Sequence, residues 1–257
     1  MGMFRDKVGL VMGVANDHSI AWAISQALWA EGAELGFTHL PSPSSERRVR
    51  KLVEARGPKI LLPCDVQKDD DLARLFDAVG EAYGRLDFLV HSIAFAPPHE
   101  LRRSYVETSR EGWHLAMDIS AYSLVAVCRS AAPLLSEGAG VLTISYIGGE
   151  QVVPGYNLMG VCKAALEHSV RYLAWDLGRE KKVRVNAISA GPMRTLSSAG
   201  IAEFDKIREH AAKKSCLGHI VEPADVGTTA LYLLGPMSGG VTGETIHVDG
   251  GYSIVGL

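Results

Sequence analysis

The chain has no apolar run long enough to cross a membrane and no excess of positive charge. A spanning helix needs about 18 or more consecutive apolar residues, and none occurs in the 257 residues. The 26 lysines and arginines face 29 aspartates and glutamates, so the formal net charge is −3. Electrostatic binding to nucleic acid requires a basic surface. We therefore expect neither a membrane nor a nucleic acid as partner.

Cysteine is scarce, and its spacing matches no metal or redox motif. The chain carries Cys64, Cys128, Cys162 and Cys216, with no Cys-x-x-Cys pair and no Cys/His spacing for zinc. We therefore expect reduced thiols, no metal, and a cytoplasmic location. The charged stretch 5–7 interrupts the apolar start, which argues against a signal peptide.

Linker-like and low-complexity segments are also lacking. Apolar residues make up 47% and charged residues 21% of the chain, which is typical of globular domains and excludes disorder. The 27 glycines follow no collagen or linker pattern. An α/β unit of this size is commonly one domain, so we expect a single dinucleotide-binding catalytic domain over residues 1–257.

Short apolar runs alternate with longer amphipathic segments. The runs predict strands at Lys7–Met12, Glu34–Thr38, Lys59–Cys64, Leu86–His91, Gly140–Ser145, Val183–Ser189 and Thr245–Val248. Helices are predicted near Ser19–Glu31, Glu46–Arg56, Asp69–Tyr83, Arg110–Leu135, Tyr156–Leu177, Glu203–Lys214 and Pro223–Leu234, and a loop at Pro41–Ser45. This order predicts an α/β, doubly wound, Rossmann-like domain. Its parallel sheet of about seven strands would have helices on both faces.

Ligands of such sheets bind beyond the carboxyl ends of the strands. After the first predicted strand, Gly13 leaves room for a pyrophosphate, and Ser19 is expected to cap the next helix and to donate to phosphate. Only one glycine of the G-x-G-x-x-G pattern is present, so a plain capped turn fits equally well.

The residues after the second and third predicted strands would face the adenosine half of a dinucleotide. The second strand is followed by Leu40 and Pro41. Neither the acid that binds the ribose of NAD nor the arginine that binds the extra phosphate of NADP is present, and we favour NAD. After the third strand, Asp65 and Val66 could frame an adenine, or Asp65 could open a turn before the acidic stretch 69–71.

The later strand ends carry the candidate chemistry. Small residues at 92, 94 and 96 leave space for a flat ligand. Tyr156 and Lys163 are seven residues apart, which is close to two helical turns, so we expect them on one helix face. Such a lysine would lower the phenol pKa and offer donors to a ribose, although an ordinary amphipathic helix would look the same. The small, polar stretch after Met193, up to Gly200, suits a lid.

Together these motifs resemble a known family. The segments MGVANDHSIAWAI, CDV, HSIAFAP, SYIGGEQVVPGYNLMGVCKAALE and RVNAISAGPMRTL resemble the short-chain dehydrogenase/reductase superfamily, and within it the bacterial NADH-dependent enoyl-acyl carrier protein reductases. Ordinary superfamily members carry Tyr-x-x-x-Lys. Here Gly160 stands four residues after Tyr156 and Glu150 four after Tyr146, so the pattern is Tyr-x6-Lys with a second tyrosine ten residues earlier.

The resemblance implies a reaction and roles for single residues. NADH would deliver hydride to the β-carbon of a trans-2-enoyl thioester on acyl carrier protein, a step of type II fatty acid elongation. Tyr156 would donate to the enolate oxygen, Lys163 would hold the nicotinamide ribose, and Tyr146 would belong to the active site. The implied cofactor contacts are Gly13, Ser19, Ile20, Leu40, Asp65, Val66, Ile93, Lys163, Met193, Arg194, Thr195, Leu196 and Ser197, and Ala96 would lie by the thioester.

The resemblance also implies partners. NADH is expected rather than NADPH, and the family is usually tetrameric, so the apolar segment Tyr252–Leu257 is expected in a subunit interface. Because acyl carrier protein is acidic, a basic patch is expected near the site. The candidates Arg194, Lys206, Arg208, Lys213 and Lys214 could equally be a solvated helix face.

Two other functions are weighed against the enoyl reductase. A reductase of ketones or alcohols would need the Tyr-x-x-x-Lys spacing, which is absent. A dinucleotide-binding module without catalysis would be favoured by a broken catalytic pair, but both Tyr156 and Lys163 are present.

Overall fold

A single parallel sheet organises the chain in the computed structural model, which describes residues 2–195 and 204–256. Within these residues the strand order is β3-β2-β1-β4-β5-β6-β7, and every neighbouring pair is parallel. The strands are β1 Val8–Met12, β2 Glu34–His39, β3 Leu61–Pro63, β4 Leu86–His91, β5 Leu135–Ser145, β6 Arg184–Ala190 and β7 Thr245–Val248. The order reverses between β1 and β4, where ligands of doubly wound sheets bind.

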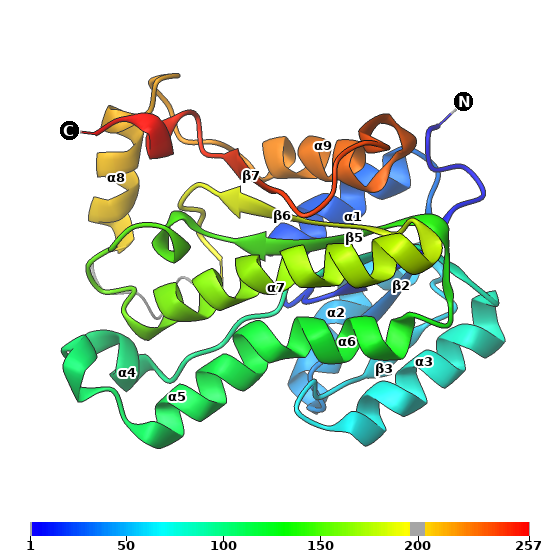
Figure 1. Cartoon of the computed structure of the whole chain (residues 1–257). Helices are drawn as coiled ribbons and strands as arrows, with labels where there is room; N and C mark the ends of the chain where they lie inside the picture. The colour runs from blue at the N-terminus through cyan, green and yellow to red at the C-terminus, as the bar shows by residue number, and fades with distance from the viewer. Residues whose placement is uncertain (1, 196–203, 257) are drawn as a thin grey trace.

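Helices cover both faces of this sheet (Figure 1). They are α1 Ile20–Ala30, α2 Pro43–Val53, α3 Asp69–Tyr83, α4 Pro98–Arg102, α5 Arg110–Met117, α6 Ser123–Ala131, α7 Leu158–Lys181, α8 Phe204–Lys214 and α9 Pro223–Leu234. Buried residues of α1, α2 and α9 share one apolar cluster, and those of α3, α6 and α7 share another. The predicted doubly wound α/β fold is confirmed.

The continuous burial of β1 explains why its sequence does not alternate in polarity. All five residues of β1 are buried. Leu10 and Met12 point into the cluster beneath α3, α6 and α7, whereas Val11 points into the cluster beneath α1 and α9. Successive side chains of a strand face opposite sides, so a strand covered on both faces must be apolar throughout.

Some predicted boundaries were wrong, each for a local reason. The helix expected from Glu46 begins at Pro43, because Ser42 Oγ accepts from Ser45 N at 3.2 Å and proline is favourable in a first turn. The expected helix 110–135 is α5, a π-helical segment Asp118–Tyr122, and α6. Only its last residue belongs to β5, which starts at Leu135 rather than Gly140, and α4 was not predicted.

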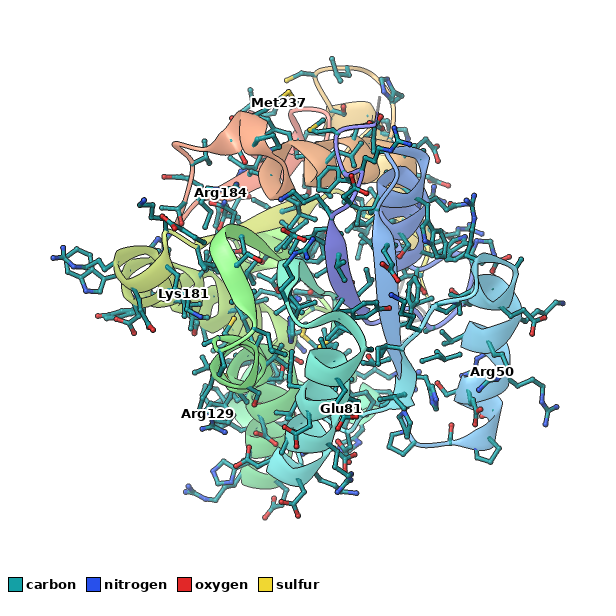
Figure 2. The ribbon with its side chains drawn as sticks, turned by 90° about the vertical axis from the view of Figure 1, so that its right-hand side faces the viewer. Arg50, Glu81, Arg129, Lys181, Arg184 and Met237 are labelled. Atoms are coloured by element: carbon teal, nitrogen blue, oxygen red, sulfur yellow. The ribbon has the colours of Figure 1, made fainter. Side chains whose placement is uncertain are left out.

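Buried interactions secure the amino-terminal ends of the strands, away from the carboxyl edge. Arg184, at the start of β6, donates through Nη1 to Leu233 O at 2.5 Å and through Nη2 to Gly235 O at 3.1 Å (Figure 2). Lys181, at the end of α7, donates to Ala132 O at 2.8 Å. Across residues 2–195 and 204–256, no helix is both long and apolar enough to span a bilayer.

Candidate active site

The site lies at the carboxyl edge of the sheet, where β1 and β4 are neighbours. Ser92 N donates to Met12 O at 2.9 Å, which continues the pairing just past β4. Gly13 has φ +108°, and a Cβ placed on it would lie 2.0 Å from Ser92 O. Only glycine fits at this position, because a side chain would collide with the backbone that follows β4. The backbone is therefore free of side chains at the point where the strand order reverses.

The prediction that Ser19 caps α1 with its side chain was wrong. Its Oγ accepts from Ala15 N and Asn16 N, both at 3.0 Å, and no side chain caps the helix. The hydroxyl closes the loop 15–19 on itself, and α1 begins at Ile20. The first-turn N–H groups of α1 are thus left without a side-chain acceptor, which is the arrangement that binds phosphate.

The ends of β2 and β3 present one exposed and one turn-forming residue. Leu40, directly after β2, is 66% exposed. Asp65 Oδ1 accepts from Gln67 N at 3.2 Å, while Asp65 N donates to Asp71 Oδ2 at 2.9 Å. The Asp65 carboxylate therefore forms a turn, as in the alternative prediction. Val66 is half-buried against the core.

The segment after β4 is held by a residue that the sequence did not reveal. Ser120 Oγ accepts from Phe95 N at 2.8 Å and donates to Phe95 O at 2.9 Å. Ser120 is fully buried in the π-helical segment, an irregularity that often occurs at functional sites. The spacing of apolar residues does not identify such a residue, because its role depends on hydrogen bonds with a loop residue 25 positions away in the sequence.

A small apolar cluster, called here the Tyr156 cluster, joins this segment to the start of α7. Its buried members are Ala96, Leu101, Ala116, Tyr156, Leu158, Met159 and Cys162, with Ala94, Met117, Tyr146 and Val153 packed against them. The structure thus brings together Ala96, Tyr146 and Tyr156, which the sequence analysis singled out separately. Ile93 lies outside this cluster, half-buried on the α3 and α6 side.

The two tyrosines pack edge to face. The centroids of the Tyr146 and Tyr156 rings are 4.9 Å apart at an interplanar angle of 68°. Burial raises the pKa of both phenols well above the ordinary value. The prediction that Lys163 lowers the phenol pKa was wrong, because desolvation dominates. Tyr156 is consequently a neutral hydrogen-bond donor rather than a phenolate.

Lys163 is buried on α7 and points to the end of β5. Its Nζ donates to Ile144 O at 2.7 Å, and burial lowers the pKa of Lys163 to about 8. One turn later, Glu167 accepts a hydrogen bond from Ser145 Oγ. Two side chains of α7 therefore fasten the helix to the last residues of β5, directly before Tyr146.

The prediction that Tyr156 and Lys163 share one helix face was also wrong. The helix expected from Tyr156 begins at Leu158, so Tyr156 precedes the helix and does not share its periodicity. Asn157 has φ +40°, which no helical residue adopts. The turn before α7 aims Tyr156 at the site.

Gly148 packs against the Tyr156 ring and gives a first prediction. A Cβ on Gly148 would lie 2.4 Å from Tyr156 Cδ1, so Gly148→Ala must displace the ring. If the Tyr156 phenol acts on the substrate, kcat should fall on the order of 10- to 100-fold, since small displacements of a reacting group are costly. Steady-state kinetics measures it, with Gly240→Ala as control, because a Cβ there meets nothing within 4 Å. Unchanged kcat in Gly148→Ala would contradict the placement of Tyr156.

The segment after β6 contains the next cofactor residues expected from the sequence. Met193 is buried in the cluster beneath α1 and α9. Arg194 is exposed, and its Nη2 donates to Asp205 Oδ1 at 2.6 Å, while Thr195 is half-buried. Leu196 and Ser197, and the rest of the expected lid up to Gly200, lie outside the described residues.

Comparisons with known proteins agree over essentially the whole chain. A family model described as Enoyl-(Acyl carrier protein) reductase matches residues 13–253. The chain is 46% identical over 253 residues to the Enoyl-[acyl-carrier-protein] reductase [NADH] FabI of Nostoc, covering 98% of each. The solved structure of the NADH reductase from Aquifex aeolicus is similar, with TM-score 0.96, 44% identity and full coverage of both chains. So is that from Bacillus cereus with NADP+ and an indole naphthyridinone, with TM-score 0.96, 46% identity and full coverage.

Proposed function

Since the chain belongs to the enoyl-[acyl-carrier-protein] reductase family and is an NADH-dependent oxidoreductase of this type, we propose that Tyr156, Tyr146 and Lys163 carry its chemistry. The substrate is the trans-2 double bond of an enoyl group on acyl carrier protein. The observation that supports this assignment most is the buried Tyr156 phenol beside Ala96 and Tyr146, at the carboxyl edge of the sheet.

The residues at this edge fit a dinucleotide. The backbone at Gly13 lies free of side chains next to Ser92, and α1 offers first-turn N–H groups without a side-chain cap. Further contacts are proposed for the other cofactor residues named from the sequence: Ser19, Ile20, Leu40, Asp65, Val66, Ile93, Met193, Arg194, Thr195, Leu196 and Ser197. NADH is favoured over NADPH because Leu40 and Pro41, rather than an arginine, follow β2. When bound, NADH supplies the hydride.

Tyr156 is the proposed donor to the substrate. As hydride reaches the β-carbon, negative charge moves to the thioester oxygen, and a donor placed there lowers the barrier. Burial keeps the Tyr156 phenol protonated and excludes water, which strengthens such a hydrogen bond. A proton from solvent then adds to the α-carbon, which gives the saturated acyl chain. Tyr146 packs against the Tyr156 ring and so orients it.

Lys163 is the proposed ribose-binding group. Its Nζ donates to Ile144 O, which fixes the position of the ammonium and leaves other protons for cofactor hydroxyls. In its charged form it also favours the enolate by electrostatic attraction.

Turnover with matched substrates tests the function. We expect NADH oxidation, followed at 340 nm, with a crotonyl or longer enoyl thioester and none with a panel of ketones. Turnover of ketones alone would favour the alternative reductase. NADH binding without turnover of any substrate would favour a non-catalytic module.

A basic surface on α8 is proposed to receive the acidic carrier protein. Lys206 and Lys213 are exposed on α8, whereas Arg208 is half-buried. Lys214 lies over the Tyr252 ring, 5.0 Å from its centroid, and Arg194 pairs with Asp205. Because they are exposed, Lys206 and Lys213 are the two members of the expected patch that we propose to meet the carrier protein.

Charge reversal distinguishes this patch from a solvated helix face. In a Lys206→Glu/Lys213→Glu variant, we expect KM for a carrier-linked enoyl substrate to rise on the order of tenfold, since like charges repel a partner. KM for the coenzyme A thioester should stay unchanged, and steady-state kinetics on both substrates checks this. Lys51→Glu on α2 serves as control, as an exposed lysine elsewhere. Equal effects on both substrates would contradict the docking role.

We further propose a homotetramer in the cytoplasm. Large exposed apolar surfaces mark contact sites, and Tyr172 and Trp175 on α7 are 66% and 62% exposed. In the C-terminal segment Ile254 is 80% exposed, which supports its burial by another copy. The free thiols of all four cysteines are consistent with a reducing compartment.

A further inference from the structure

Tyr156 sits between two residues with left-handed backbone. Gly155 has φ +80°, and Asn157 has φ +40° with ψ −119°. Among the described residues only Asp6 and Lys182 share a positive φ with Asn157 without being glycine. Such a conformation costs free energy in a residue that carries a Cβ, and it persists where surrounding contacts enforce it.

The contacts that enforce it run from the Asn157 side chain to α4. Asn157 Nδ2 donates to Leu101 O at 3.0 Å and to Arg103 O at 2.6 Å. These carbonyls lie at the carboxyl end of α4, where a helix leaves acceptors without partners. The Leu101 side chain packs in the Tyr156 cluster. The side-chain amide of Asn157 thus joins the turn that contains Tyr156 to the end of α4.

The other end of this segment is fastened independently. Glu100 on α4 is fully buried, and its carboxylate accepts from Ser109 Oγ at 2.5 Å and from Ser109 N at 3.2 Å. Ser109 is the N-cap of α5, since its Oγ accepts from Gly112 N. The segment 98–109 is therefore tied to α5 by Glu100 and to the start of α7 by Asn157.

We propose that Asn157 is a positioning residue of the reductase. Its side-chain amide holds in place both the Tyr156 hydroxyl and α4, which forms one wall of the enoyl-chain site. The inference rests on the proposed function, because it assigns the enoyl chain to the Tyr156 cluster. The backbone strain at Asn157 is then the cost of presenting the Nδ2 protons to α4 while the preceding side chain faces the site.

Two substitutions separate the amide from the backbone conformation. Asn157→Gly tolerates the positive φ but removes the donor. Asn157→Asp keeps the shape but places carboxylate oxygens against two carbonyl oxygens. In both we expect kcat/KM for an enoyl thioester to fall on the order of 10- to 100-fold, with KM raised, since the wall and the donor both shift. The Kd for NADH should stay within about twofold of wild type.

The KM distinguishes positioning from mere stability. A variant that only unfolds part of the protein loses apparent kcat in proportion and keeps its KM. Lys182→Gly, which replaces the positive-φ residue at the other end of α7, is the matched control and should leave KM unchanged.

Each outcome decides the proposal. Unchanged KM and kcat in Asn157→Gly would overturn it while leaving the proposed function intact, provided that the wild type reduces enoyl thioesters. A wild type inactive on enoyl thioesters would overturn the proposed function itself. If circular dichroism shows Asn157→Gly unfolded, Asn157→Asp decides. Loss of folding in both would assign Asn157 to stability and overturn the positioning role.

Discussion

Tyr156→Phe is expected to lower kcat on an enoyl thioester by about 100- to 1,000-fold, the usual effect of removing one donor from a developing oxyanion. The substitution deletes only the hydroxyl, so the ring keeps its contact with Tyr146 and its place in the Tyr156 cluster. The Kd for NADH should stay within about twofold, because no cofactor contact is assigned to the phenol. Steady-state kinetics gives kcat, and fluorescence titration gives the Kd for NADH.

Tyr146→Phe is the matched control for this experiment. Tyr146 is half-buried, and desolvation also raises the pKa of its phenol, but its proposed contribution is the packing that a phenylalanine retains. We therefore expect a smaller loss of kcat than in Tyr156→Phe. If Tyr156→Phe kept full activity, or if Tyr146→Phe were the more damaged variant, the donor would have been assigned to the wrong residue.

Lys163→Met is expected to raise the Kd for NADH on the order of 100-fold. The substitution removes a buried charge-assisted donor, and each such contact is worth about 1.5–3 kcal/mol. Methionine fills a similar volume, so the apolar surroundings on α7 stay packed. Lys181→Met is the control, because Lys181 also lies on α7 and also donates to main-chain carbonyls, at the end remote from the site.

The pH dependence of the Kd for NADH tests the same role of Lys163. Burial lowers the pKa of Lys163 to about 8, so the free protein holds the proton below this pH and releases it above. If the ammonium binds the cofactor, the Kd for NADH is flat below pH 8 and rises above it, by up to about tenfold per pH unit. Lys163→Met should lose this rise. A Lys163→Met protein with wild-type Kd, or a wild-type Kd that falls above pH 8, would contradict the role.

The parts of the fold that follow from local apolar patterning could be predicted from the sequence. Strands such as Val8–Met12 are recognised because burial on both faces requires continuous apolar residues. The short α4 could not be predicted this way. Its five residues are too few to show a period. Its position depends on Asn157, which donates to its last carbonyls from the start of α7, and on the contact of its own Glu100 with Ser109.

The site shows the same division. Gly13, Tyr146 and Lys163 follow strands or fit a family spacing, so residue type and order identify them as candidates. The predictions that were wrong depend on which of several nearby groups forms a hydrogen bond with a given side chain. Ser19 turns to the loop amides instead of capping α1, and Lys163 turns to Ile144 O while desolvation controls the Tyr156 phenol. Sequence spacing does not encode this competition.

A structure of the protein with NAD+ and an enoyl thioester bound would show which side chain donates to the thioester oxygen. We expect the Tyr156 hydroxyl within hydrogen-bond distance, about 2.6–3.2 Å, of that oxygen. We also expect the Lys163 ammonium to contact the nicotinamide ribose. A thioester oxygen bound by another donor, with Tyr156 directed away from it, would contradict the proposed role of Tyr156.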